Sequence, residues 1–161
     1  MPDNFIDIAE FENEEVTAFI KDLQKKTKNI NGGADEYVGL LSAIVYEDVI
    51  RHFEQEMGSG GPWAQWSTFY KEQMDKQGKG GNKILQDTGR LRNNFQPNSR
   101  RKVRNGILWF NNATTKGGFP YAAAHDTGGS ILPKRDFMWL SKAGFDKIEI
   151  QTLQYLLEKG I

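Results

Sequence analysis

Apolar residues recur at helical spacing in two long segments of the N-terminal third of the chain. In the first segment they fall at i, i+3, i+4 and i+7, at Val16, Phe19, Ile20 and Leu23. Asn13 precedes this stripe as a helix cap, and glycines at 32 and 33 end it. The same period continues from about Asp35 to Met57. The pattern predicts two amphipathic helices joined by a short glycine turn.

The middle of the chain changes from helical to strand character. Glycine-rich stretches at 58–61 and 78–81 predict two mobile loops, and between them Ser67 is expected to cap a short helix ending at Met74. Asn105 followed by Gly106 is a strong signal for a two-residue hairpin turn. The turn would join a basic strand at about 99–104 to an apolar strand at 107–110.

The last third of the chain returns to helical character. Residues 114–118 predict a loop, 119–125 a helical turn and 130–137 an extended segment. Apolar residues from Ile148 to Leu157 predict a final helix ending at Gly160. Because neither a repeat nor a linker interrupts the pattern, residues 1–161 are expected to form one domain. Its predicted fold class is α+β, with a small antiparallel sheet packed against two long N-terminal helices and a C-terminal helix.

The formal charge of zero, from 21 basic and 21 acidic residues, conceals an uneven distribution. Residues 1–20 contain six acidic side chains and no Lys or Arg, whereas residues 83–104 contain seven basic side chains and a single carboxylate, Asp87. Such polarity can direct one surface of a protein toward a complementary surface. Two solvated faces would give the same pattern, so both interpretations stay open.

Several classes of protein are disfavoured by what the sequence lacks. There are no cysteines for a thiolate metal site or nucleophile, and no apolar run approaches the ~20 residues that cross a bilayer. The N-terminus lacks the pattern of a signal peptide. Glycine-rich nucleotide-binding motifs are also missing, so we expect no cofactor and no small-molecule substrate. Because there is no long apolar run, we also expect no membrane contact.

Two Asp-Thr-Gly triplets, beginning at Asp87 and Asp126, suggest an aspartic protease as an alternative. A pepsin-like site takes its two aspartates from two similar lobes, and 39 residues are too few to fold one lobe between them. A dimeric protease would need one triplet, but Arg90 follows the first triplet and a helix-prone alanine run precedes the second. Asp-Thr-Gly also favours a tight turn. We interpret both triplets as turns and expect no catalytic residue.

The two histidines offer little for a metal site. His52 falls on the second predicted helix beside Phe53 and is expected to be a partly buried surface residue. His125 precedes Asp126, but no third ligand follows at a recognisable spacing. We therefore expect both histidines to be structural and no metal to be bound.

The basic strand raises a second alternative, direct contact with DNA. Arg100, Arg101, Lys102 and Arg104 would contact phosphates and Trp109 would stack on a base. However, Trp109 lies in an apolar run that indicates a core strand. The same basic residues would also suit a surface lining a DNA passage or one facing an acidic protein partner.

Four short motifs follow one another in the chain: Trp63-x-x-Trp66-Ser67, Ile84-Leu85-x-x-Thr88-Gly89-x-Leu91, Tyr121-Ala122-x-x-His125-x-x-Gly128 and Leu132-Pro133-x-Arg135-x-Phe137. In this order they resemble the phage virion morphogenesis family, which includes the Mu G protein and the P2 tail completion S protein. The resemblance covers about residues 5–158. The glycine-rich stretches at 58–61 and 78–81, together with Asp126, depart from the family pattern.

The resemblance implies a non-enzymatic structural protein of a tailed phage or prophage, acting in tail completion or head–tail joining. Its location would be the virion, at the tail or the head–tail junction, and the host cytoplasm during assembly. Its partners would be other phage tail or connector proteins and further copies of itself, near packaged DNA. The candidate partner contacts are Trp63, Trp66, Arg100, Arg101, Lys102 and Arg104. The motif residues given a structural role are Leu85, Thr88, Gly89, Leu91, Tyr121, His125, Gly128, Pro133, Arg135 and Phe137.

The charge polarity adds a hypothesis about assembly. If the acidic N-terminal region of one subunit meets the basic strand of its neighbour, the contact is heterologous and closes into a head-to-tail ring.

Overall fold

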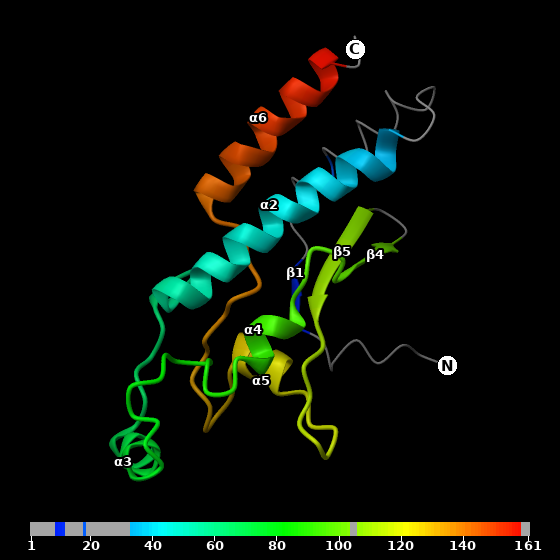
Figure 1. Ribbon diagram of the computed structural model, residues 1–161. Coiled ribbons are helices and arrows are strands. Elements are labelled where there is room, and N and C mark those ends of the chain that lie inside the picture. Colours follow the sequence, from blue (N-terminus) through cyan, green and yellow to red (C-terminus); the bar gives the residue numbers. More distant parts are fainter. Residues whose placement is uncertain (1–8, 12–17, 19–32, 104–105, 159–161) are drawn as a thin grey trace.

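The computed structural model describes residues 9–11, 18, 33–103 and 106–158 (Figure 1). Helices and two small antiparallel sheets make up this part of the chain, which confirms the predicted α+β class. The first predicted helix, from Asn13 to about residue 31, lies outside the described residues except for Ala18, which is helical. None of the described helices has a stretch long and apolar enough to cross a bilayer.

The longest element is α2 (Gly33–Gln55), which confirms the helix predicted from its apolar period. One face of α2 contacts α6 (Lys142–Glu158), where the Tyr37 hydroxyl is hydrogen-bonded to Thr152. Another face contacts the sheet, where the Trp109 indole donates to Ser42 Oγ over 3.2 Å. Figure 1 shows α2 running between α6 and the sheet. Its apolar positions Val45, Val49 and Phe53 are fully buried there.

The larger sheet has the strand order β1 (Ala9–Phe11), β5 (Gly106–Asn111), β4 (Arg100–Val103), and both pairings are antiparallel. Val103 is paired with Gly106, so the predicted hairpin between the basic and apolar strands is confirmed, while Arg104 and Asn105 of its turn lie outside the described residues. The apolar strand β5 is the central strand, and its residues 107–109 are buried. Among the described strands, the basic strand β4 therefore lies at an edge of the sheet.

The glycine-rich stretch at 58–61 differs from the predicted loop. It forms a tight hairpin of β2 (Met57–Gly58) and β3 (Gly61–Pro62), with Gly61 at a φ of 129°. The Ser59 N–H donates to the Asp136 carboxylate over 3.1 Å, so a contact distant in sequence holds the hairpin. The second stretch, 78–81, is a turn without regular structure, as expected.

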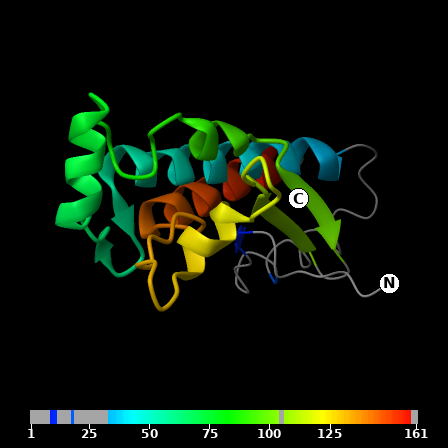
Figure 2. The ribbon, with the colours of Figure 1, turned by 90° about the horizontal axis from the view of Figure 1, so that it is seen from below.

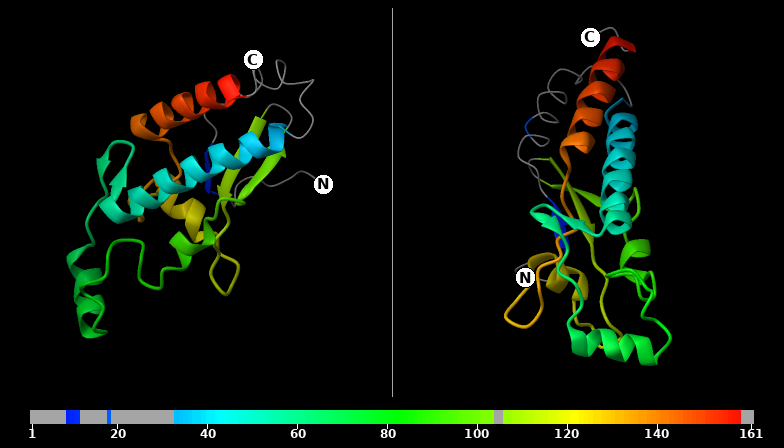
Figure 3. Two further views of the ribbon diagram at one scale, coloured as in Figure 1. Left: turned by 45° about the horizontal axis from the view of Figure 1, so that its top comes forward. Right: turned by 90° about the vertical axis from the view of Figure 1, so that its left-hand side faces the viewer.

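Short helices connect the long ones. Ser67 caps α3 (Thr68–Lys76) by accepting from the Tyr70 N–H, which confirms its predicted role. Then come α4 (Arg90–Asn94) and α5 (Tyr121–Thr127), the second of which confirms the helical turn expected at 119–125. Figure 2 shows α3 at one end of α2 and the β4–β5 hairpin toward the other end. In both views of Figure 3, α3 stands away from the α2–α6 pair.

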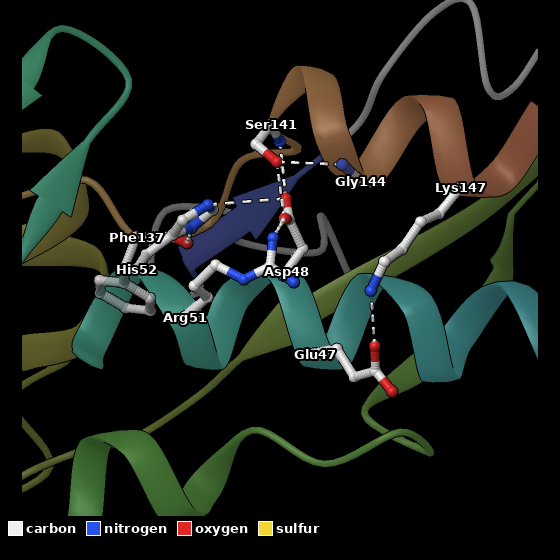
Figure 4. A network of polar contacts seen from close by, with 8 residues as sticks. All are labelled: Glu47, Asp48, Arg51, His52, Phe137, Ser141, Gly144 and Lys147. Atoms are coloured by element: carbon white, nitrogen blue, oxygen red, sulfur yellow. Dashed lines mark hydrogen bonds and ion pairs between the residues drawn. The ribbon is translucent and has the colours of Figure 1, made fainter. Parts of the chain in front are cut away.

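A buried polar network ties α2 to the start of α6 (Figure 4). The Asp48 carboxylate is 2% exposed and accepts from both the N–H and the hydroxyl of Ser141, each over 2.6 Å. Ser141 in turn caps α6, because its Oγ accepts from the Gly144 N–H. Burial raises the pKa of Asp48, but the adjacent His52 ring and the Ser141 donors outweigh burial, and the net pKa is lowered.

His52 belongs to the same network, so its expected position at the surface is wrong. Its side chain is buried, its Nδ1 donates to the Phe137 carbonyl over 3.0 Å, and its Nε2 lies 3.6 Å from Asp48. The ring is stacked on Trp139 with the ring centroids 4.0 Å apart. His52 is therefore a core residue that joins α2 to the segment before α6.

Candidate functional site

Four segments that are far apart in the sequence meet around one pocket of about 680 Å³. They are the chain from residue 64 into α3, residues 83–91, one side of α5, and residues 131–135. The pocket therefore brings together parts of all four predicted motifs. The candidate residues lining it are Trp66, Leu85, Thr88, Leu91, Tyr121, His125, Pro133 and Arg135.

Arg135 supplies a buried positive charge to the pocket. The residue is 7% exposed, and its guanidinium donates to the carbonyls of Ala64 over 2.9 Å and Gln65 over 3.4 Å. Burial lowers the pKa of Arg135, but an arginine stays protonated in proteins. Among the described residues no carboxylate forms an ion pair with it. A buried cation without a counter-charge favours the binding of an anion.

His125 lies on the pocket wall near this charge. Burial, with a smaller effect from the positive charge of Arg135, lowers the pKa of His125 to about 4. The ring is therefore neutral at pH 7, and its Nδ1 is buried without a hydrogen-bond partner among the described residues. The His125 carbonyl accepts from the Arg135 N–H over 2.8 Å, so α5 holds the segment that carries the arginine.

Tyr70, Ile131 and Lys83 are among the pocket residues that were not predicted as site residues. Tyr70 on α3 packs edge-on against Trp66, with ring centroids 5.6 Å apart, and is half exposed. Ile131 is 97% exposed at the rim. The Lys83 ammonium donates to the Glu54 carbonyl over 2.7 Å. An aromatic residue on a short polar helix is a signal in the sequence for Tyr70, whereas nothing local in the sequence distinguishes Ile131 or Lys83.

Backbone turns shape the pocket wall. Leu85 has a φ of 61°, which is unusual for a residue other than glycine, and Gly89 has a φ of 68° at the start of α4. The Thr88 hydroxyl accepts from the Arg90 N–H over 3.3 Å. The turn predicted at Thr88 and Gly89 is therefore present, and it leads into α4.

The two Asp-Thr-Gly aspartates have separate partners. The Asp87 carboxylate is exposed and accepts from the Lys79 ammonium over 2.9 Å and the Asn82 amide over 3.2 Å. Asp126 accepts instead from the N–H groups of Phe137 and Met138 over 2.9 and 3.0 Å. Burial raises the pKa of Asp126, and these two donors partly oppose the rise. The triplets thus lack the paired carboxylates that an aspartic protease uses within one chain.

The tryptophans chosen as partner contacts separate into two kinds. Trp63 is 3% exposed, packs edge-on against Phe53 and donates to the Asp136 carbonyl over 2.9 Å. Its selection as a surface contact is therefore wrong, because its indole belongs to the core of the subunit. Trp66 is partly exposed and lines the pocket.

The basic strand is exposed at its two middle positions. Arg101 and Lys102 are exposed, and Lys102 forms a surface ion pair with Asp35 over 3.2 Å. Arg100 donates to the Pro97 carbonyl over 2.6 Å, while Arg104 lies outside the described residues. Trp109, the expected stacking group of the DNA alternative, is 2% exposed and unable to meet a base.

The remaining motif residues support the fold. Phe137 is fully buried against Phe53, with ring centroids 5.0 Å apart, and Leu91 is buried. Gly128 ends α5 at a φ of 73°. Within the part of the chain that the structure describes, no group of three or more acidic or histidine side chains is arranged to hold a metal ion.

Acidification from pH 7 to pH 4 is expected to destabilise the protein through His125. In the folded protein the pKa of His125 is about 4, below its ordinary value of 6.5. As the pH falls from 7 to 4, His125 therefore takes up a proton more readily in the unfolded chain than in the folded protein, and the free energy of unfolding decreases. We expect a loss on the order of 2 kcal/mol, allowing for partial exposure of the ring. Urea unfolding of His125→Gln should show a smaller loss over the same window. Equal losses in both proteins would contradict this role.

Comparison of the chain with protein-family models, curated proteins and solved structures gives no match. The family resemblance drawn from the four motifs therefore stays a prediction.

Proposed function

We propose that this protein is a non-enzymatic structural protein of a tailed phage or prophage that acts in tail completion or head–tail joining through contacts with other proteins. The observation that carries this proposal is the meeting of the four motifs at one open pocket. Motif residues that served only the fold would be spread through the core. Instead, Trp66, Tyr121 and Pro133 retain partial or full exposure around a shared cavity.

The chemistry of the pocket favours binding over catalysis. Its aspartate is already held by Lys79 and Asn82, and no hydrogen bond among the described residues joins the His125 ring to a carboxylate or a hydroxyl. A general base is usually oriented by such a partner. What the pocket offers is a buried cation, a neutral histidine and apolar walls.

A second surface supports the head-to-tail ring. Among the described strands β4 lies at an edge of the sheet, and the side chains of Arg101 and Lys102 on it are exposed. The six acidic residues of the N-terminal twenty supply a complementary charge. In the proposed ring, this acidic region of one subunit contacts the basic strand of the next.

The ring is tested by reversing the charge of the basic strand. Arg101→Glu combined with Lys102→Glu is expected to convert an oligomer into monomer at low ionic strength, because it places like charges at the contact. A matched control, Lys116→Glu combined with Lys147→Glu, changes the net charge equally at exposed positions of other elements. Sedimentation velocity measures the result. If both double variants sediment like the unmodified protein, the basic strand is not the contact.

DNA contact is the second candidate function, and the exposed Arg101 and Lys102 favour it. A gel shift with duplex DNA across a salt series distinguishes it from the ring. Binding that weakens with salt and is lost in Arg101→Glu with Lys102→Glu would favour DNA contact over protein contact.

A further inference from the structure

Among the described residues, no carboxylate balances the positive charge of Arg135 in the pocket at the four motifs. Arg135 is more than nine-tenths buried, lines the cavity and uses its hydrogen bonds within the subunit on two backbone carbonyls, which carry no net charge. Asp87, the carboxylate of the pocket, is paired with Lys79. Lys83 adds a second cation to the lining. The electrostatics of the cavity are therefore complementary to an incoming carboxylate.

The walls of the same cavity are complementary to an apolar side chain. Trp66 and Tyr70 form one aromatic wall, and Leu132 and Ile131 come from the segment that carries Arg135. A volume of about 680 Å³ is in the range of sites that enclose a ligand, and it has room for a few amino-acid side chains. The cavity thus combines one charged position with an apolar lining.

We propose that this pocket binds an extended acidic segment of a partner protein, in which a carboxylate reaches Arg135 and a neighbouring aromatic or branched aliphatic side chain packs against Trp66 and Tyr70. This inference rests on the proposed assembly function and names the chemistry of the partner. Charge complementarity selects an acidic segment, and the aromatic wall selects one with large apolar residues. A phosphate or a small free acid would leave that wall uncovered.

The probe is a blocked peptide with the sequence of residues 3–8, because its carboxylates at Asp3 and Asp7 flank Phe5 and Ile6. Its matched control replaces both aspartates by asparagine. Titration into ¹⁵N-labelled protein is expected to shift the amide signals of residues 64–70 and 131–135. The asparagine peptide should bind about tenfold more weakly, since the lost contacts are charge-assisted hydrogen bonds.

Variants of the protein separate this site from a structural role of Arg135. Ile131→Glu places a negative charge at the rim, and because Ile131 is 97% exposed the change leaves the core untouched. It should weaken the acidic peptide about tenfold and affect the asparagine peptide less. Ile150→Glu, the same change at an exposed position of α6, should bind like the unmodified protein.

Three results would overturn the proposal: no signal shift up to millimolar peptide, equal binding of the two peptides, or unchanged binding by Ile131→Glu. Benzoate binding as tightly as the peptide would also overturn it by indicating a small-molecule site. Because the ring places this same acidic region on β4, the titration separates the two sites by which amide signals shift, those of residues 64–70 and 131–135 or those of residues 100–103. A ring that forms without peptide binding rejects this inference alone, and peptide binding by a strict monomer rejects the ring alone.

Discussion

Replacing Asp48 by alanine is expected to lower the free energy of unfolding by about 3–5 kcal/mol, as the loss of one partner from a buried charged network does. The carboxylate is the acceptor for two donors of Ser141, and Ser141 is the residue that caps α6. The negative charge of Asp48 also lies at the N-terminal end of α6, which is the positive end of the helix dipole. Without Asp48, the Ser141 N–H and the buried His52 ring lose their charged neighbour. Urea unfolding followed by circular dichroism measures the loss.

The matched control is Glu47→Ala, one residue earlier on α2. Glu47 also reaches α6, through an ion pair with Lys147 over 3.1 Å, but both side chains are exposed (Figure 4). An exposed pair contributes at most about 1 kcal/mol. A loss for Asp48→Ala as small as that of Glu47→Ala would show that the Asp48 network does not stabilise the contact between α2 and α6.

Replacing Gly128 by alanine is expected to destabilise the protein by about 2–4 kcal/mol, because it combines backbone strain with a steric clash. Gly128 has φ 73° and ψ −175°, a conformation that residues other than glycine rarely adopt. A Cβ at this position would lie 2.8 Å from both the N and the Cα of Lys134, and Lys134 precedes Arg135 in the pocket wall. The substitution should therefore also displace the arginine.

Gly129→Ala is the control for this effect. A Cβ there meets no atom within 4 Å, and its φ lies outside the left-handed region, so the change should be close to neutral. Thermal unfolding of both variants and titration of the acidic peptide measure the two consequences. If Gly128→Ala unfolds and binds peptide like Gly129→Ala, the turn at Gly128 does not hold the pocket wall.

The elements that the sequence predicts well are those fixed by local chemistry. Three examples are the apolar period of α2, the Ser67 cap of α3 and the hairpin joining β4 to β5. Each depends on residues that are only a few positions apart in the sequence. The two Asp-Thr-Gly triplets lie at turns or helix ends, as the sequence predicts, but the Asp126 carboxylate also accepts from the more distant N–H groups of Phe137 and Met138.

Long-range contacts explain the features that the sequence analysis missed. The hairpin at 57–62 forms with the help of Asp136, and Trp63 is buried because its indole meets the carbonyl of that same residue. One missed feature did carry a signal. Asp48 and His52 fall three and seven residues after Val45, on the apolar stripe of α2, and polar residues on such a stripe indicate a buried network.

The candidate site depends even more on tertiary structure. The motifs identified Arg135 and His125 and assigned them to scaffold, but no local pattern shows that they share a cavity with Trp66 and Leu85. Arg135 is buried without an ion-pair partner among the described residues, and this becomes visible only in the folded chain, because it depends on the positions of carboxylates that are distant in sequence.

Sedimentation velocity of the unmodified protein at 50 mM and 500 mM salt, over a hundredfold range of concentration, tests most directly whether the protein assembles through its charged surfaces. The proposal predicts one discrete oligomer at low salt that dissociates toward monomer at high salt. A monomer under every condition would contradict it.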